Sequence, residues 1–302
     1  MSGPLTIVEV TGRLGIGGVE THVCSLARGL LSRGHRVVLV SQDPGVCGEE
    51  AEAAGAELVT APFKNETLPD LIETLKPLDA DIVHAHNYRA ARVGAPLARA
   101  LNLPYVMSVH GPRPWWKRAV FGGWSKTVLT ASEADRDGVL GPFGVSNGQV
   151  IVGFYGVDTH RFTPGLDASP LRAEWGVDGA PVILNVSRFS RRKVLPALAL
   201  LTALPLVRRR IPDATLVLVG EGSRFERVAS EVDRLNRALG DRVALVSGPR
   251  RDVPRVMNAG NVVVATATTA IESLATAAPT VAYGRTGYFG IVTPENYEEA
   301  RS

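Results

Sequence analysis

The sequence has few cysteines: Cys24 and Cys47 are the only two among 302 residues. They do not form a C-x-x-C pair, and the chain does not begin with a signal peptide. Nothing therefore indicates a disulfide framework or a cysteine-ligated metal. We expect a reduced, cytoplasmic protein in which Cys24 belongs to the core.

Long apolar runs and a strong net charge are also missing. No run approaches the roughly 18 apolar residues that a membrane-spanning helix needs. Lys+Arg 33 against Asp+Glu 30 gives a net charge of +3, which is too mild for a duplex nucleic-acid binder unless it is concentrated on one face. We expect no nucleic-acid partner. Hydrophobic residues, in contrast, make up 45% of the chain, and the length suggests about two domains.

The first part of the chain alternates strands with helices. Leu5–Val10 is an apolar run, residues 11–18 form a glycine-rich turn, apolar residues then recur three or four apart from Val19 to Leu30, and Arg36–Ser41 is a second apolar run. Strand, turn, helix and strand make a βαβ unit. Further strands are predicted at Glu57–Ala61, Asp81–Ala85, Tyr105–Val109 and Thr127–Ala131, with helices at Leu68–Leu75, Ala90–Leu101 and Glu133–Leu140. Such strands form a parallel sheet covered on both faces.

The segment Val150–Asp178 interrupts this alternation because it is rich in glycine and proline, as domain boundaries often are. A second α/β series follows it. Strands are predicted at Pro181–Val186, Thr215–Val219, Val243–Val246, Val262–Ala265 and Thr280–Ala282, and helices at Leu195–Arg209 and Ser223–Leu239. We therefore predict two Rossmann-like domains, residues 1–160 and 161–302.

Two loops can bind phosphate. Gly17 and Gly18 end the turn before the first helix, where exposed backbone N–H groups favour an anion, although the turn is not a G-x-G-x-x-G fingerprint. Arg188 and Lys193, five residues apart, follow the strand VILNVS and can grip a pyrophosphate. A tight turn without a ligand and a solvated basic loop remain the alternatives.

The segment Asn261–Pro279 (NVVVATATTAIESLATAAP) reads as a strand, a loop and a helix with Glu272 in its first turn. Open α/β sheets bind ligands at such junctions, so we predict the nucleotide half of a site here.

Histidines end two strands of the first domain. His84 and His86 follow one another along a strand, and His110 ends the next. This spacing is a weak metal signal, and we expect no metal. A strand-end histidine can instead donate a hydrogen bond to a sugar hydroxyl or a phosphate, whereas His84 is expected to be a satisfied core residue.

The segment from Pro114 to Trp124 combines three of the four tryptophans with two cations. Trp115, Trp116, Lys117 and Arg118 suit a membrane interface or a stacked acceptor. Inward packing of the tryptophans is an equal alternative.

In this order the segments resemble a glycosyltransferase of family 4 with the GT-B fold. The resemblance runs from about Thr6 to the end of the chain. It is carried by GGVETHV, RGHRVVLVS, DIVHAH, SVHG, TASEADRDGVL, GVDTHRFTP, NVSRFSRRK, LVGEG and IESLATAAPTVA, which begin at residues 17, 33, 81, 108, 130, 156, 185, 218 and 271.

The resemblance implies two facing domains, with an acceptor side, a donor side and a cleft between them. Gly17 and Gly18 would lie against the donor diphosphate, and His110 would line the reaction centre near the sugar. Arg188 and Lys193 would bind the pyrophosphate and assist its departure. The remaining implied donor-binding residues are Ala270, Ile271 and Glu272, of which Glu272 binds the ribose, and the segment from Gly248 to Arg250 near the base.

The resemblance also implies transfer of a sugar from a nucleoside diphosphate sugar to a hydroxyl of a glycan, lipid or small molecule. The transfer would retain the anomeric configuration and would not need a metal. The resemblance favours a UDP-sugar over a GDP-sugar as the donor. It further implies a bacterial enzyme, in the cytoplasm or in peripheral contact with the inner membrane. A non-catalytic GT-B binding protein and a sugar-nucleotide epimerase of the same fold are the alternatives. A nicotinamide dehydrogenase is disfavoured because its fingerprint is missing.

Three features depart from the family pattern. Val264 stands eight positions before Glu272, where the family has a first glutamate that contacts the donor hexose. Ala277 replaces the usual glycine of the turn before Pro279. Residues 283–295 resemble a variant branch, mainly of Gram-positive bacteria, that lacks this glutamate. Relatives usually continue beyond the equivalent of Ser302 through further helices, so we expect either a shortened chain or an unusually short member.

Overall fold

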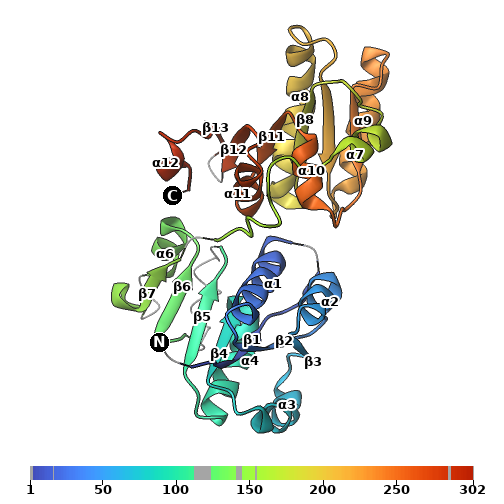
Figure 1. Cartoon of the computed structure of the whole chain (residues 1–302). Coiled ribbons are helices and arrows are strands. Elements are labelled where there is room, and N and C mark those ends of the chain that lie inside the picture. The colour runs from blue at the N-terminus through green and yellow to red at the C-terminus, as the bar shows by residue number, and fades with distance from the viewer. Residues whose placement is uncertain are drawn as a thin grey trace. The chain divides into compact units, whose positions relative to one another are not determined.

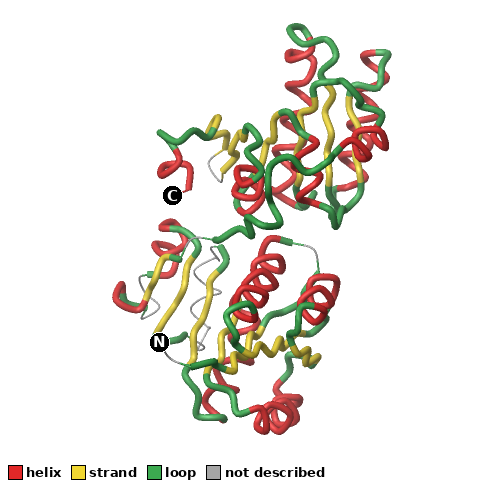
Figure 2. The backbone as a smooth tube through the Cα atoms, viewed as in Figure 1, coloured by secondary structure: helices red, strands yellow, loops and turns green. Residues whose placement is uncertain are grey.

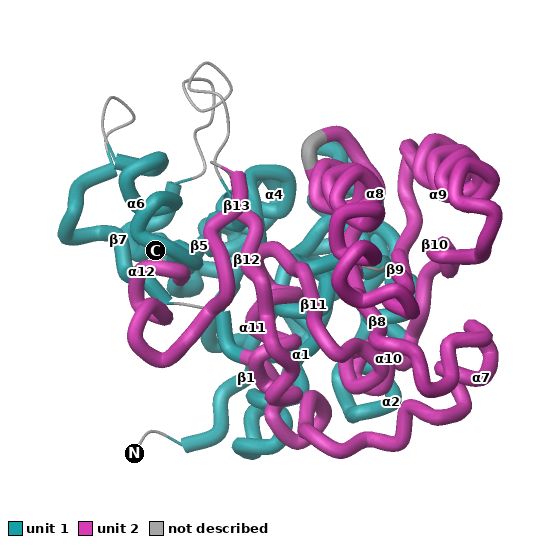
Figure 3. The backbone as a smooth tube through the Cα atoms, turned by 90° about the horizontal axis from the view of Figure 1, so that it is seen from above, with its two compact units in different colours: residues 1–156, 302 teal, residues 157–301 magenta. Residues whose placement is uncertain are grey.

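The computed structural model describes residues 3–15, 17–111, 124–140, 145–153, 155–284 and 287–301. The chain divides into two compact units, residues 1–156 and 157–301 (Figure 3). Each unit is described by itself. In each, helices and strands alternate along the chain (Figure 2).

Unit 1 is a parallel seven-stranded sheet with the strand order β3-β2-β1-β4-β5-β6-β7 (Figure 1). Its strands are β1 Thr6–Val10, β2 Arg36–Ser41, β3 Glu57–Thr60, β4 Ile82–His86, β5 Tyr105–Val109, β6 Thr127–Thr130 and β7 Val150–Val152. Its described helices of seven or more residues are α1 Gly18–Leu31, α2 Gly45–Ala53, α3 Leu68–Leu75, α4 Asn87–Ala100 and α6 Glu133–Val139.

The two faces of this sheet carry separate cores because successive side chains of a strand point to opposite faces. Val8 and Val10 of β1 pack in the core that includes α3 and α4. Val37 and Leu39 of β2 pack in the core that includes α1 and α2. Nearly every inward position is Val, Leu, Ile or Ala, as a sheet buried on both faces requires. Glu9, between Val8 and Val10, is therefore an unusual residue for this strand.

Unit 2 is a six-stranded sheet with the order β10-β9-β8-β11-β12-β13, in which only β13 is antiparallel to its neighbour. The strands are β8 Val182–Val186, β9 Thr215–Val219, β10 Ala244–Ser247, β11 Val262–Ala265, β12 Thr280–Gly284 and β13 Gly287–Ile291. The helices are α7 Ser169–Trp175, α8 Leu195–Arg208, α9 Phe225–Leu239, α10 Val253–Ala259, α11 Thr268–Ala275 and α12 Tyr297–Arg301.

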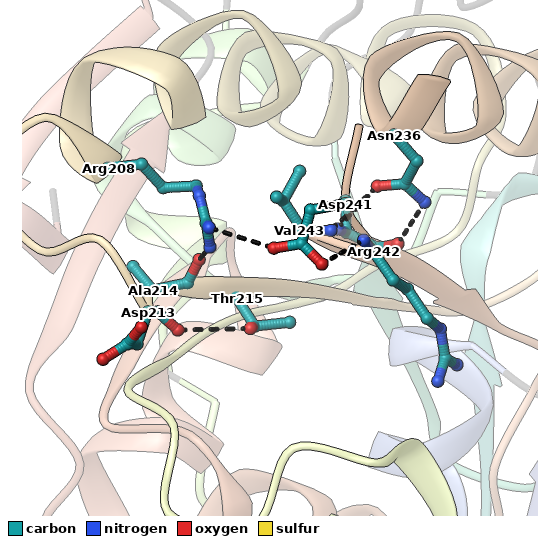
Figure 4. Close-up of polar contacts among 9 residues, drawn as sticks. Arg208, Asp213, Ala214, Thr215, Asn236, Asp241, Arg242 and Val243 are labelled. Atoms are coloured by element: carbon teal, nitrogen blue, oxygen red, sulfur yellow. Dashed lines mark hydrogen bonds and ion pairs between the residues drawn. The ribbon is translucent and has the colours of Figure 1, made fainter. Parts of the chain in front are cut away.

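Polar side chains fasten the ends of α8 and α9 to the sheet of unit 2 (Figure 4). Arg208 donates to the carbonyl of Ala214 at 2.8 Å and lies 3.2 Å from Asp241. Asn236 accepts from the backbone of Val243 at 3.0 Å and donates to the carbonyl of Ala244 at 2.9 Å. These contacts are local, and they stabilise the ends of the two helices.

The predicted fold class is confirmed: both units are mostly parallel sheets with alternating helices. Five helices and strands were missed, namely α2, β7, α7, β13 and α12. The helix α2 contains two glycines and begins after Pro44, and β7 has three residues. Both lack the length on which a periodic pattern depends. The helix α7 lies inside the segment predicted as a boundary, and Trp175 holds it in the core.

The prediction that Glu272 lies in the first turn of its helix is wrong. The helix α11 begins at Thr268, so Glu272 is one turn further in, and the first turn contains no acidic residue. Ala267 precedes the helix with a φ of 49°, a conformation that a pattern of residue types does not reveal.

Candidate functional site

Each sheet has one point where the strand order reverses. In unit 1, β1 lies between β2 and β4, and in unit 2, β8 lies between β9 and β11. Open parallel sheets bind ligands outside the carboxyl ends of the two strands at such a point. The residues at the ends of β1 and β4, and of β8 and β11, are therefore the first candidates.

In unit 1 a carboxylate and two histidines meet at this point. Glu9 of β1 and His84 of β4 are register partners, and His86 projects from the same face two residues later. Oε2 of Glu9 lies 3.0 Å from Nδ1 of His84 and 2.6 Å from Nε2 of His86. Glu9 is 1% exposed and His86 is completely buried.

Hydrogen bonds continue from this pair to the surface. Nδ1 of His86 lies 3.1 Å from Nε2 of His110, and Nδ1 of His110 lies 2.5 Å from the hydroxyl of Tyr155. On the other side, Nε2 of His84 lies 2.8 Å from the hydroxyl of Ser108. We call these six residues, Glu9, His84, His86, Ser108, His110 and Tyr155, the histidine chain.

The carboxylate of Glu9 determines the tautomers along the histidine chain. Because an ionised carboxylate only accepts, Nε2 of His86 donates to it. Nδ1 of neutral His86 then accepts from Nε2–H of His110, and Nδ1 of His110 accepts from Tyr155. Each imidazole uses both nitrogens, so the ring of His110 is oriented from both sides.

Burial and neighbouring groups keep Glu9, His86 and His110 in the protonation states that these hydrogen bonds require. Burial would raise the pKa of Glu9, but its interactions with His84 and His86 lower that pKa far below its ordinary value. Burial, together with His84, lowers the pKa of His86. Burial, then His86 and His22, lower the pKa of His110 to about 2. At neutral pH the carboxylate is therefore charged, and His86 and His110 are neutral.

His22 of α1 completes the cluster. Its ring centroid lies 5.3 Å from that of His110 and 4.8 Å from that of Tyr155, and burial lowers its pKa to about 4. One ligand atom from each of His22, His86 and His110 lies within 4.8 Å of the others, as do those of Glu9, His84 and His86. These residues are thus close enough to share a metal ion. The expectation that no metal is needed stays a prediction.

The glycine-rich turn leads into α1. Gly17 is the residue before the helix. Because glycine has no side chain, no side-chain hydrogen bond from this residue caps the helix. The carboxylate of Glu20 lies over it, so that a Cβ at Gly17 would be 2.4 Å from Oε2 of Glu20. An anion at this helix end is favourable, and a bound diphosphate would replace the carboxylate. The donor contact assigned to Gly17 and Gly18 stays a prediction.

In unit 2 the loop after β8 carries Arg188 and Lys193, both of which are exposed. Phe189 between them is completely buried, and its backbone N–H donates to the carbonyl of Glu221 at 2.7 Å. The backbone of Lys193 donates to the carbonyl of Ser190 at 2.9 Å. The loop is therefore anchored by an apolar side chain and backbone bonds, while its cations face solvent.

Two glycines of the LVGEG motif allow the loop after β9 to lie against the Arg188 loop. A Cβ at Gly220 would come 1.9 Å from the carbonyl oxygen of Ser187, and one at Gly222 would come 2.6 Å from that of Phe189. Their φ angles of 148° and 141° also favour glycine. The glycines thus set the position of the cationic loop by close backbone packing.

Glu272 is a buried acid one turn into the neighbouring helix α11. It is 8% exposed, and burial raises its pKa to about 7, although Arg161 opposes the rise. Val264 lies in β11, and its carbonyl accepts a 2.7 Å hydrogen bond from the side chain of Asn185 in β8. Ala270 and Ile271, also assigned to the donor, are half-buried in the same helix.

The segment Gly248–Arg250 follows β10. The guanidinium of Arg250 forms ion pairs with Asp252 at 2.9 Å and with Glu174 at 2.8 Å. These pairs join the segment to α7 and α10, which gives Arg250 a structural role. Its contact with a base stays a prediction. Trp115, Trp116, Lys117 and Arg118, and with them the predicted membrane contact, lie outside the described residues.

Five residues of these sites were not found from the sequence: Glu9, His22, Ser108, Tyr155 and Arg161. A signal existed for Glu9, because an acid within an apolar strand must find partners when the strand is buried. The other four are positioned by tertiary packing, which no local pattern reports.

Comparisons with known proteins agree with this geometry. Residues 16–161 match Glycosyltransferase Family 4, and residues 180–298 match Glycosyl transferases group 1. The chain belongs to glycosyltransferase family 4. The same fold is found in the Anabaena protein HepE, whose crystal structure contains UDP-glucose. HepE superposes with a TM-score of 0.77 at 19% identity, over 92% of this chain and 80% of that one.

Two curated relatives of this family 4 member are informative. The GDP-mannose-dependent alpha-(1-6)-phosphatidylinositol monomannoside mannosyltransferase of Mycolicibacterium smegmatis is 42% identical over 81 residues, 26% of this chain and 21% of the relative. Glycogen synthase of Mycobacterium tuberculosis is 26% identical over 254 residues, 69% of this chain and 59% of the relative. The chain thus spans from about a fifth to about three fifths of these relatives. Among the described helices, none combines the length and the apolar character needed to cross a bilayer.

Proposed function

We propose that this family 4 member transfers a sugar from a nucleoside diphosphate sugar to a hydroxyl acceptor, with retention of the anomeric configuration. The bond between the anomeric carbon and the diphosphate oxygen breaks, a bond to the acceptor oxygen forms, and the departing diphosphate takes up the hydroxyl proton. The diphosphate departs with the bonding electron pair.

The observation that carries the proposal is the arrangement at the switch point of unit 2. Arg188 and Lys193 stand on a loop that Phe189 anchors and that Gly220 and Gly222 position. Pre-positioned cations stabilise charge that grows on a leaving diphosphate. Glu272, on α11 after the neighbouring strand β11, supplies a carboxylate for the ribose hydroxyls.

In unit 1, His110 is proposed to orient the transferred sugar. Its Nε2–H and Nδ1 are engaged by His86 and Tyr155, so the ring has one fixed orientation. Glu9 and His86 are positioning residues for that ring. Gly17 and Gly18 are proposed to lie against the diphosphate.

The donor base and the need for metal belong to the proposal as well. HepE was crystallised with UDP-glucose, whereas the mannosyltransferase relative is named as GDP-mannose-dependent. We favour a UDP-sugar and a mechanism in which Arg188 and Lys193 take the place of a metal.

Calorimetry with UDP and with GDP is the direct test. We expect one of them to bind, and Arg188→Ala and Lys193→Ala to weaken that binding, whereas the matched exposed cation Arg227→Ala on α9 does not. Failure of both nucleotides to bind would overturn the proposal. Turnover of the donor sugar without any acceptor would favour an epimerase. Nucleotide binding without transfer to any hydroxyl acceptor would favour a non-catalytic binding protein.

A further inference from the structure

The two cysteines of the chain meet in unit 1, although they lie 23 positions apart in the sequence. Cys24 is in the middle of α1 and Cys47 is in the first turn of α2, and these two helices pack against each other. The thiol of Cys24 donates to the carbonyl oxygen of Cys47, with 2.9 Å between sulfur and oxygen. The two thiols are also hydrogen-bond partners of each other. Both cysteines are free, and none of the roles proposed above uses them.

The two thiols have different surroundings. Cys24 is 1% exposed and packs in the apolar core formed by α1, β2 and α2, whereas Cys47 is half-buried at the edge of that core. Cys47 is also the third residue of α2, and the first turn of this helix contains no acidic residue. The partial positive charge at a helix N-terminus favours a thiolate over a thiol. Cys47 is therefore the more accessible of the two and the easier to ionise.

Neighbouring groups act in the same direction. The hydrogen bond from Cys24 lowers the pKa of Cys47 in spite of burial and of the carboxylates of Glu50 and Glu20, and Arg28 also lowers that pKa. The hydrogen bond with Cys47, followed by burial, raises the pKa of Cys24 far above its ordinary value. One thiol of the pair thus ionises while the other stays protonated beside it.

This combination is typical of redox-active cysteine pairs. In such pairs an accessible, more acidic thiol lies next to a second thiol that can react with its oxidised form. A metal site would need more ligands than two thiols, and among the described residues neither Cys24 nor Cys47 belongs to a group of three or more side chains that could hold an ion. The pair therefore favours oxidation over metal binding.

We propose that Cys24 and Cys47 are a modification site, at which a peroxide oxidises the two thiols to a disulfide between α1 and α2. The thiolate of Cys47 attacks one peroxide oxygen, the O–O bond breaks, and the second oxygen leaves as water after taking up a proton. The sulfur of Cys24 then attacks the sulfur of the Cys47 sulfenic acid, the S–O bond breaks, and the hydroxyl leaves as water with the Cys24 proton. Two thiols are oxidised by two electrons, and one peroxide is reduced to two waters.

The disulfide would connect the two sides of the glycine-rich turn at residues 11–18. Within that turn, the carbonyl of Leu14 accepts a 3.0 Å hydrogen bond from the backbone N–H of Cys47, and a Cβ at Gly45 would lie 2.6 Å from the same carbonyl oxygen. Cys24 lies beyond the turn, in α1. A bond between the two sulfurs closes a loop in the unfolded chain, so unit 1 should resist unfolding better when it is oxidised.

The test treats the wild-type chain with hydrogen peroxide and measures its intact mass and its proteolytic peptides without reduction. We expect each chain to lose two hydrogen atoms, and a peptide that contains Cys24 to be linked to one that contains Cys47. The melting temperature should rise by about 5 °C or more, and dithiothreitol should reverse both changes. A chain that keeps two free thiols, or that forms disulfides only with other chains, would overturn the proposal.

Two single variants assign the roles of the thiols. In Cys24→Ala, dimedone should label Cys47 after peroxide treatment, because no second thiol removes the sulfenic acid. In the matched variant Cys47→Ala, the buried Cys24 should stay unlabelled in the folded chain, and peroxide should leave its melting temperature unchanged. Labelling of Cys24 but not of Cys47 would contradict the assigned order. If a variant does not fold, the mass of the wild type still decides whether the disulfide forms.

The modification site is independent of the proposed function. None of these measurements requires a nucleotide or a sugar acceptor. Formation of the disulfide in a chain that binds neither UDP nor GDP would support the modification site and remove the proposed function.

Discussion

The polar groups at the two switch points are organised in opposite ways. In unit 1 Glu9, His86 and His110 are buried or half-buried and bonded to one another. In unit 2 Arg188 and Lys193 are exposed on a loop that Phe189 and backbone hydrogen bonds anchor. A closed network orients a ring before any ligand arrives, whereas exposed cations remain accessible to an incoming anion.

From this difference we expect the cations of unit 2 to affect mainly turnover. We expect the buried carboxylate of unit 1 to affect mainly the stability of the fold. Arg188→Ala or Lys193→Ala should lower turnover by about 100-fold or more, the loss typical of removing one group that stabilises transition-state charge. Arg227→Ala should leave turnover unchanged. Steady-state kinetics with the donor found by calorimetry measures the effect, and normal turnover in both loop variants would remove the cations from the mechanism.

Glu9→Gln should act mainly on unit 1. The amide no longer holds His84 and His86 by charge, and disrupting a buried, bonded charge typically lowers the free energy of unfolding by about 3 kcal/mol. Turnover should also fall by about tenfold or more because the tautomer of His110 is no longer fixed, while nucleotide affinity in unit 2 should not change.

Urea unfolding, calorimetry and ¹⁵N shifts of the imidazoles check these three outcomes. The exposed Glu57→Gln, which loses its pair with Arg36, should cost less than about 1 kcal/mol. If Glu9→Gln changes stability but neither the imidazole shifts nor turnover, Glu9 is structural only.

Glu272 makes nucleotide affinity depend on pH. Its pKa is about 7, and only the ionised form accepts hydrogen bonds from both ribose hydroxyls. From one pH unit below that pKa to one unit above it, affinity should rise about tenfold. Glu272→Gln should remove this part of the dependence, which separates it from the titration of the nucleotide's own phosphate. An unchanged pH profile in the variant would contradict the role.

The contributions of His22 and Glu272 to stability should respond to acid in opposite directions. The pKa of His22 is about 4 in the folded chain and about 6.5 in the unfolded one, so unfolding takes up protons and the stability of unit 1 falls as pH drops below about 6.5. The pKa of Glu272 is raised to about 7, so its favourable contribution is present below about 4.5 and lost as pH rises through 7. His22→Gln should reduce the acid sensitivity seen in urea unfolding.

Removal of metal should have the smallest effect. If Arg188 and Lys193 neutralise the leaving diphosphate, turnover after treatment with a chelator should equal that of the untreated protein. His22, His86 and His110 are close enough to bind an ion, so a loss of turnover that zinc restores would contradict metal independence and assign that cluster a catalytic role.

Much of the fold was predictable because parallel strands are apolar throughout. β9 (TLVLV) is buried at every position, and glycines and prolines mark many of the element boundaries. Short elements such as β7 and α7 escaped because their burial depends on contacts with distant residues. The basic loop and Glu272 were recognisable from family motifs, but their geometry was not, as the misplacement of Glu272 within α11 shows.

The histidine chain was only partly predictable for a related reason. His84, His86 and His110 stood out as a motif, yet Glu9, the common partner of His84 and His86, lies some 75 residues earlier, and only the pairing of β1 with β4 brings it to them. The carboxylate explains the hydrogen bonds of the two histidines, and the expectation that no metal binds here stays a prediction.

The close packing of Gly220 against the carbonyl of Ser187 means that one substitution outside the ligand-binding residues can inactivate the site. The cationic loop keeps its place because one position in the adjoining loop has no side chain, so a single nucleotide change from a glycine to an alanine codon is enough to displace it. Such a change would leave Arg188, Lys193 and Glu272 intact in the sequence. A chain could then carry every ligand-binding residue of its family and still be inactive.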